Sequence, residues 1–299
     1  MSDSPELEVI ADDHYEMLSD ATRMKAYQQA IERVVQPGDV VIDLGTGMGI
    51  LALMAARAGA RRVYAIEARD SIHIAQRVAA HNGYGGVIAF LHGNSQATNL
   101  PERADVLISE TLGSFGFDEN TVEHVNDIRE RLLKPDARLL PRRLKTWIVP
   151  VHSPGAATYQ QFWKNIAGFD FSVAREQSAE VIGVAKVKVD EFIGSPALLT
   201  DIDLADGKSP QIGRLLHFIG ERDEEVHGLA GWFEAELCDD LILSTHPQAP
   251  ATHWQQAYLA LTEPLPVRAG DKIEVMLKSR PQGWERDDAQ IEWDCRIVG

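Results

Sequence analysis

The chain has 299 residues, of which 44% are hydrophobic and 25% charged; this composition excludes a disordered chain and is typical of a globular protein. Acidic residues outnumber basic ones by 45 to 29, and the net charge of −16 argues against binding to nucleic acid or to an anionic membrane. Cys238 and Cys295 fit neither a metal-ligand spacing nor a disulfide framework. The acidic start does not resemble a signal peptide, so we expect a cytoplasmic protein. The sequence also gives no reason to invoke a metal.

The first 140 residues alternate short apolar runs with helical patterns. The apolar runs predict buried strands at 40–42, 62–66, 87–91 and 104–109. The helical patterns predict helices at 20–35, 50–58, 71–82 and 119–133. Asp70 is expected to cap the third of these helices, and residues 134–136 to end the last. This alternation of strands and helices predicts an α/β domain with a parallel, doubly wound sheet.

The pattern changes near Pro141 and becomes mostly β. Strands are predicted at 144–149, 181–189, 231–237, 257–261 and 272–277. The segment 159–180 interrupts them and is rich in aromatic residues and helix formers. Such a segment is either an inserted core helix or a contact surface for another subunit. We therefore expect two domains, residues 1–140 and residues 141–299.

A glycine-rich loop, residues 43–49, lies between the first predicted strand and the helix after it. Glycines allow the backbone to turn sharply and to approach a ligand closely. A dinucleotide-binding loop needs a small residue at its third conserved position, where this chain has Ile50. Glu67 ends the second predicted strand, and a carboxylate there can accept hydrogen bonds from both hydroxyls of a ribose. The spacing therefore favours a nucleoside-containing cofactor other than a dinucleotide.

Two glutamates follow the fourth predicted strand. Glu110 lies at its end, where ligands bind in open α/β sheets, and Glu119 follows after a loop with two glycines. An arginine guanidinium is planar, always charged and a poor nucleophile. Two carboxylates can hold it by paired hydrogen bonds and leave its target nitrogen freer to attack a methyl group. Alternatively, Glu119 only favours a helix N-terminus and Glu110 is a surface residue.

Four stretches in the same order together resemble the protein arginine methyltransferases. Residues 109–119 resemble the family's double-glutamate loop, and residues 16–27 have the form E-M-L-x-D-x-x-R-x-x-x-Y of its first helix. Residues 244–256 are similar to its T-H-W loop, and residues 163–170 to its dimerisation arm. The resemblance implies an α/β Rossmann-like methyltransferase domain followed by a mostly β, barrel-like domain with a helical arm at about 158–180. The active site would lie between the two domains.

The resemblance also implies roles for individual residues. S-adenosylmethionine would be the cofactor, with its methionine carboxylate bound by Arg23 and its adenine near Ser95 and Gln96. The remaining cofactor-binding residues would be Asp43, Gly45, Gly47, Gly49 and Glu67. The catalytic residues would be Glu110 and Glu119 together with a pair formed by Asp20 and His253, and the substrate pocket would include Met17 and Trp254.

The implied reaction is N-methylation of an arginine in a basic protein or peptide by a homodimer. The dimer would form when the arm packs on the partner's cofactor domain. Upstream of Glu16 the family carries aromatic residues that cover the cofactor, and residues 6–13 of this chain have none. This difference keeps open a small guanidine or amine metabolite, or a biosynthetic peptide, as the substrate. A non-catalytic partner subunit is a further alternative. The sequence does not predict which methylated product forms.

Overall fold

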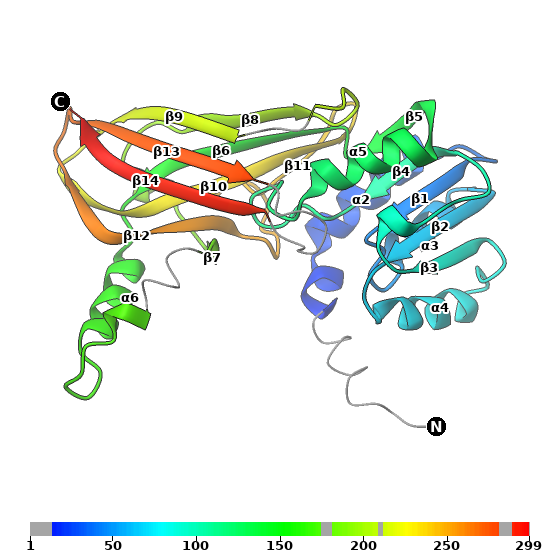
Figure 1. The fold of residues 1–299 in the computed structure, drawn as a ribbon, viewed down its shortest axis with the longest axis horizontal. Coiled ribbons are helices and arrows are strands. Elements are labelled where there is room, and N and C mark those ends of the chain that lie inside the picture. Colours follow the sequence, from blue (N-terminus) through cyan, green and yellow to red (C-terminus); the bar gives the residue numbers. More distant parts are fainter. Residues whose placement is uncertain (1–13, 175–180, 209–211, 281–288, 299) are drawn as a thin grey trace.

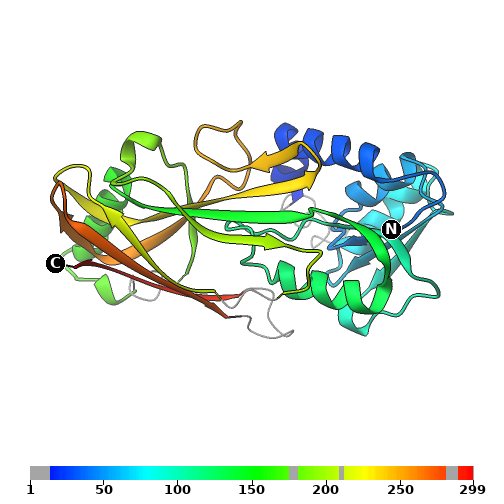
Figure 2. The ribbon, with the colours of Figure 1, turned by 90° about the horizontal axis from the view of Figure 1, so that it is seen from above.

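The computed structural model describes residues 14–174, 181–208, 212–280 and 289–298. The chain forms an α/β domain and a β domain that lie side by side in an elongated molecule (Figures 1 and 2). Within the described residues, no helix has the length and apolar character needed to cross a membrane.

The α/β domain is built on a five-stranded parallel sheet with the order β3-β2-β1-β4-β5. Central strand β1 pairs with β2 and with β4, and all five of its residues are buried, as expected for a sheet covered by helices on both faces. The prediction of a doubly wound Rossmann-like sheet is confirmed. The strands are β1 (Val40–Leu44), β2 (Arg62–Glu67), β3 (Ile88–His92), β4 (Ala104–Ser109) and β5 (Leu133–Leu140).

Among the described residues, the helix Ala21–Val34 and three later helices accompany this sheet, and Ala21–Val34 begins at a side-chain cap. Asp20 accepts a hydrogen bond from the Arg23 amide at 2.9 Å, and Tyr27 and Ile31, one turn apart, are fully buried. Asp70 occupies the N-cap position that we predicted, but its side chain makes no capping hydrogen bond. The helices are α2 (Ala21–Val34), α3 (Ile50–Arg57), α4 (Ser71–His81) and α5 (Thr121–Leu132).

The end of α5 differs from the prediction. The helix stops as expected, but residues 134–136 belong to strand β5, which begins at Leu133 directly after the helix. Pro135 has no amide proton to donate. It is tolerated because β5 is an edge strand, and on its outer side no neighbouring strand needs that hydrogen bond. The next strand, β6, already belongs to the second domain.

The β domain contains two antiparallel sheets that pack on a shared core, and the described strands do not close into one ring. The first sheet has the order β7-β12-β10-β6-β8, with β11 paired to β10, and the second has the order β14-β13-β9. Its strands are β6 (Arg143–Val151), β7 (Gly183–Ala185), β8 (Ala197–Asp203), β9 (Ile212–Ile219), β10 (Glu224–Cys238), β11 (Leu241–Ser244), β12 (Gln256–Val267), β13 (Lys272–Arg280) and β14 (Gln290–Val298).

The prediction of a strand at 181–189 is largely wrong. Only β7 forms there, and a short 3-10 helix, Val189–Glu191, follows it. The Val187 amide donates to the side chain of Gln256 at 2.9 Å instead of to a neighbouring strand, so the ladder ends. The strands β8, β9, β11 and β14 were not predicted.

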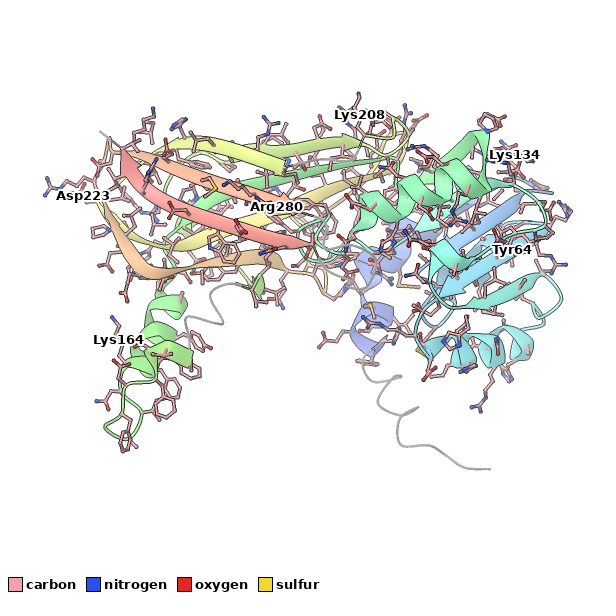
Figure 3. The ribbon with its side chains drawn as sticks, viewed as in Figure 1. Tyr64, Lys134, Lys164, Lys208, Asp223 and Arg280 are labelled. Carbon is pink, nitrogen blue, oxygen red and sulfur yellow. The ribbon has the colours of Figure 1, made fainter. Side chains whose placement is uncertain are left out.

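The helical arm, α6 (Pro154–Lys164), projects from the β domain, and Lys164 at its end forms an ion pair with Glu263 of β12 at 3.6 Å (Figure 3). The side chain of Ser153 caps its first turn by accepting from the Ala156 amide at 3.3 Å. After the helix, Ile166 and Phe169 form a two-way backbone bridge at the tip. The predicted arm thus exists, although residues 175–180 of the predicted range lie outside the described residues.

The loop between β4 and α5 packs directly on the β domain. Phe115 in this loop is fully buried against Gly231 of β10, where a Cβ atom would lie 2.1 Å from the phenyl ring. The Phe115 carbonyl also accepts a hydrogen bond from Thr146 of β6 at 3.1 Å. The two predicted glutamates flank this loop, so the domain interface and the candidate site share one segment.

We therefore predict that Gly231→Ala destabilises the protein by about 1–3 kcal/mol, because the added methyl group overpacks the interface at Phe115. The measurement is the denaturant midpoint. Gly213→Ala on β9 is the matched control, since its Cβ atom would meet nothing within 4 Å. Equal midpoints for the two variants would contradict the proposed packing.

Candidate active site

A cavity of about 580 Å³ opens at the carboxyl ends of the parallel strands. The structure brings most of the predicted residues together around it, from five separate segments of the chain. Those that line it are Met17, Arg23, Gly45, Gly47, Glu67, Ser95, Glu110 and Glu119. The others lie behind the wall or beside it, namely Asp20, Asp43, Gly49, Gln96, His253 and Trp254.

The glycine-rich loop forms one wall, and its backbone is left-handed at each of its three glycines. At Gly45, with φ of +71°, a Cβ atom would lie 2.8 Å from the methyl group of Thr111. Gly49 precedes α3, and a Cβ atom there would lie 3.1 Å from Ala75 of α4. These positions require glycine for conformation and for space, and Gly45 and Gly47 line the cavity.

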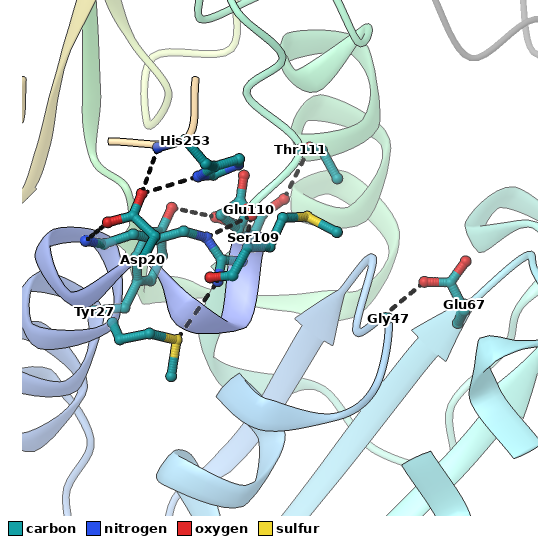
Figure 4. Close-up of polar contacts among 11 residues, drawn as sticks. Asp20, Tyr27, Gly47, Glu67, Ser109, Glu110, Thr111 and His253 are labelled. Carbon is teal, nitrogen blue, oxygen red and sulfur yellow. Dashed lines mark hydrogen bonds and ion pairs between the residues drawn. The ribbon is translucent and has the colours of Figure 1, made fainter. Parts of the chain in front are cut away.

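Glu67 lies at the end of β2 and fixes the glycine loop. One carboxylate oxygen accepts from the Gly47 amide at 2.8 Å (Figure 4), and the other accepts from the Arg69 amide at 2.9 Å. Each oxygen has two lone pairs, so both keep acceptor capacity for the hydroxyls of a ligand. The predicted ribose-binding carboxylate is thus held in place by the loop beside it.

Asp43 lies at the base of the loop and is completely buried. Its carboxylate accepts a hydrogen bond from the Thr46 hydroxyl at 2.5 Å. Burial raises the pKa of Asp43 to about 7 and the charge of Glu67 acts in the same direction, although the bond from Thr46 lowers it. This carboxylate shapes the loop from behind, and it does not line the cavity.

Arg23 and Glu110 form a buried ion pair on the opposite wall. The guanidinium donates through Nε to Glu110 at 3.0 Å, and through Nη2 to the same carboxylate oxygen. Its Nη1 atom donates to the Met17 carbonyl at 3.1 Å. The side chains of the pair are only 6% and 8% exposed, so the Coulomb attraction between them is weakly screened. Arg23 was predicted to bind a cofactor carboxylate, and here its partner is one of the two predicted catalytic glutamates.

Asp20 and His253 form the predicted pair. A single oxygen of Asp20 accepts from the backbone amide and contacts Nδ1 of His253, both at 2.9 Å (Figure 4). Although burial alone raises it, the hydrogen bonds from the Arg23 amide and from His253 keep the pKa of Asp20 below its ordinary value. The contact ties the start of α2 to the loop before β12.

Trp254 has a different position from the predicted one. It is 7% exposed and packs edge-on against Phe233, with ring centroids 5.3 Å apart. Its ring centroid is 5.9 Å from the Arg23 guanidinium carbon. Trp254 therefore packs beside the Arg23 guanidinium and does not line the cavity in the described structure.

The loop that carries Glu119 is folded by a carboxylate that we did not predict. Asp118 accepts from the Phe115 amide at 2.8 Å and from the Ser114 amide at 3.1 Å. Gly113 allows this fold, because a Cβ atom there would lie 2.4 Å from an oxygen of Asp118. The loop consequently returns to the cavity, and Glu110 and Glu119 line it together.

Other cavity residues were also missed by the sequence analysis. His14, Asn94, Thr111 and His124 line the cavity, whereas the predicted Gln96 does not. The Gln96 amide instead donates to the Asn94 side chain at 3.0 Å. Sequence spacing could not identify these cavity residues. Asn94 and Thr111 are chain neighbours of the predicted Ser95 and Glu110, and His14 and His124 lie on helices far apart in the chain.

Comparison with known families gives two matches. The family described as "Arginine methyltransferase oligomerization subdomain" matches residues 147–297, and "Ribosomal protein L11 methyltransferase (PrmA)" matches residues 22–129. Together these ranges include most of both domains.

Individual relatives extend over nearly the whole chain. "Protein arginine N-methyltransferase 1" of Oryza sativa subsp. indica is 30% identical and covers 96% of this chain and 76% of its own length. "Arginine N(omega)-methyltransferase" of Streptomyces achromogenes subsp. streptozoticus is 33% identical, covering 91% of this chain and 75% of its own length.

Solved structures are similar as well. A Trypanosoma brucei PRMT1 enzyme-prozyme heterotetrameric complex with AdoHcy is 27% identical, with a TM-score of 0.83 and coverage of 96% of this chain and 93% of that one. The uniquely open conformation of Arabidopsis thaliana protein arginine methyltransferase 10 is also 27% identical, with a TM-score of 0.76 and coverage of 94% and 91%.

We predict that the stability of the ligand-free protein reflects the buried Asp43. Its pKa is about 7 in the folded chain and has its ordinary value of 3.8 when unfolded, so the folded state binds the proton more tightly. Its contribution to the free energy of unfolding therefore decreases as pH rises from 4 to 7, by up to about 1.4 kcal/mol per pH unit.

Urea unfolding between pH 4 and 7 measures this contribution. The free energy of unfolding of Asp43→Asn, minus that of the wild type, should increase with pH across this window. Asp136→Asn, at an exposed carboxylate of β5, is the control and should show a constant difference. A constant difference for Asp43→Asn would disprove the prediction.

Proposed function

We propose that this chain, which belongs to the protein arginine methyltransferase family, is an S-adenosylmethionine-dependent N-methyltransferase acting on the guanidinium group of arginine in a protein or peptide. One observation carries the proposal. Two glutamates suited to a guanidinium line the same cavity as a glycine loop and a strand-end carboxylate suited to a nucleoside.

The cofactor side of the cavity suits S-adenosylmethionine. Gly45 and Gly47 of the glycine loop line the cavity, and Glu67 keeps acceptor capacity for the ribose hydroxyls. Ser95 lies at the end of the cavity where the adenine would bind, and Arg23 would bind the methionine carboxylate. When bound, this cofactor supplies an electrophilic methyl group on a sulfonium centre.

The substrate side binds and orients the guanidinium. Glu110 is paired with Arg23, and Glu119 adds a second carboxylate to the same cavity for the incoming cation. Paired hydrogen bonds from the guanidinium to the two carboxylates fix its plane and draw its positive charge toward the bonded nitrogens. The remaining nitrogen keeps more electron density and is held for in-line attack, and positioning of this kind supplies most of the rate gain.

His253 and Asp20 provide a proton acceptor close to the site. Asp20 contacts Nδ1 of His253 and so orients the ring. A histidine held in this way can accept the proton released when the nitrogen is methylated. Asp20 also caps the helix that carries Arg23, and the pair therefore positions the cofactor side as well.

The domains have separate tasks in this proposal. Residues 1–140 hold the cofactor, and residues 141–299 supply the wall beside the substrate and the arm. The arm exposes large apolar side chains, including Phe162 at 57% and Phe169 at 69% exposed, which is costly in water. These side chains support a homodimer in which the arm packs on the partner's cofactor domain. Free cysteines in the described structure support a cytoplasmic location.

A small guanidine is the second candidate substrate. The Streptomyces relative is named for arginine and not for protein arginine, and it is 33% identical over most of this chain. A free amino acid would use the same carboxylates but would need fewer contacts outside the cavity. The negative surface charge of this chain supports a basic peptide instead, since it attracts cationic partners over a longer range.

We predict that Glu119→Gln lowers methyl transfer by about 10²- to 10³-fold, because the amide keeps the shape of the side chain but removes the charge that balances the guanidinium. Transfer of label from radiolabelled S-adenosylmethionine to an arginine-rich peptide measures the effect. Glu130→Gln, on the exposed face of α5, is the matched control. Equal transfer by Glu119→Gln and wild type would contradict the role of the carboxylate pair.

The same assay separates the two substrates. If free arginine is labelled and the peptide is not, the chain methylates a small guanidine and the carboxylate pair keeps its role. Cofactor binding without label on either acceptor would favour a non-catalytic partner subunit.

We predict that Phe162→Asp converts the homodimer into monomers, because a charge on the exposed face of α6 cannot be buried against a partner. Sedimentation velocity measures the mass. Leu215→Asp, on the exposed face of β9 at similar exposure, should leave the mass unchanged. A monomeric wild type, or a dimeric Phe162→Asp variant, would exclude the arm as the dimer contact.

A further inference from the structure

The outer edge of the α/β domain carries a cluster of metal-binding side chains that has no part in the proposed reaction. Asp70 stands at the N-cap of α4, His73 lies in its first turn, and His92 ends β3. Each offers one ligand atom, and these three atoms all lie within 4.8 Å of one another. Strand β3 is the edge strand of the parallel sheet, and α4 lies beside it (Figure 1).

Two details of the geometry indicate that these groups converge on a point between them. Asp70 does not cap the helix that it precedes, although aspartate at this position normally does so. Its carboxylate turns instead toward His92 and stops 3.7 Å from Nε2. This separation is too long for a hydrogen bond.

The separation does suit two donors on one metal ion. Donors bound at ~2.1 Å in a tetrahedral site lie ~3.4 Å apart. The rings of His73 and His92 meet edge-on, with centroids 5.2 Å apart and planes at 83°. All three side chains are exposed, so the small rotations needed to close the site meet little resistance.

We propose that Asp70, His73 and His92 bind a divalent transition-metal ion such as Zn²⁺ or Ni²⁺. Two imidazoles and one carboxylate form a ligand set that favours these ions over Mg²⁺ or Ca²⁺, which prefer oxygen ligands. The exposed position leaves the remaining coordination sites to water. The proposal is independent of the methyl transfer proposed above.

The bound ion would connect the first turn of α4 to the end of β3. His92 is paired in register with Glu67 across the two strands, and the Gly93 amide donates to the Glu67 carbonyl at 2.9 Å. Ser71 and Gly93, the chain neighbours of two of the ligands, line the cavity. The ion therefore braces the outer wall of the cavity and stabilises the folded state by binding to it.

Calorimetric titration of the untagged full-length protein, first stripped with a chelator, tests the site with Ni²⁺ and with Zn²⁺ separately. Wild type should bind one ion at the cluster. His92→Gln and Asp70→Asn should weaken this binding by about tenfold or more, since loss of a direct ligand costs at least as much as loss of an outer-shell partner. His81→Ala, an exposed histidine at the end of the same helix, is the control and should bind as wild type does.

Thermal melting gives a second readout that does not depend on activity. The metal should raise the melting temperature of wild type and of His81→Ala, and should raise that of His92→Gln by clearly less. Melting of all chains in chelator verifies that the variants are folded. The proposal is overturned if wild type binds neither metal, or if both cluster variants bind and melt as wild type does.

Discussion

The buried ion pair between Arg23 and Glu110 is the contact on which the site depends. It joins the first turn of α2 to the end of β4, two segments 87 residues apart in the chain. Removing one partner of a buried pair costs about 3–5 kcal/mol, because the other charge is left without compensation. Around this pair, Asp20 reaches the loop of His253, and Trp254 packs below the guanidinium. One helical turn thus holds together both domains and both halves of the cavity.

This arrangement explains why a strongly acidic cavity can exist before a cation enters it. Arg23 pairs with Glu110, its backbone amide donates to Asp20, and Glu119 adds a further carboxylate to the cavity. Burial raises the pKa of Asp43 to about 7, so this carboxyl, behind the cavity wall, is about half protonated at neutral pH in the ligand-free chain. The cavity and the wall behind it therefore carry less negative charge than the number of their carboxylates suggests.

Local patterns predicted the parts of the fold that depend on neighbouring residues. Four of the five strands of the parallel sheet and the glycine loop follow from short apolar runs and from glycine spacing, and the structure has them, whereas β5 was not predicted. The strands β9 and β14 escaped prediction because each has an exposed face of mixed character, including Leu215 and Ile297. The sequence pointed to Glu110 and Glu119 but not to Asp118, since a carboxylate that accepts backbone hydrogen bonds has no spacing rule of its own. The three ligands of the proposed metal site were equally invisible, because sheet pairing and not sequence brings His92 to α4.

The hydrogen bond between Glu67 and the Gly47 amide has a consequence for energetics. It holds the nucleoside half of the cavity in place, and methyl transfer does not change the nucleoside of the cofactor, so we expect the contacts to it to stay the same during the reaction. Interactions that are equal in the ground state and the transition state strengthen binding but do not accelerate the reaction. Selection for faster turnover would therefore leave Glu67 untouched and act on the opposite wall, where the charge of the guanidinium changes as the new bond forms. The wall around Glu67 therefore determines how tightly the cofactor binds, and the wall around the two glutamates determines how fast the methyl group is transferred.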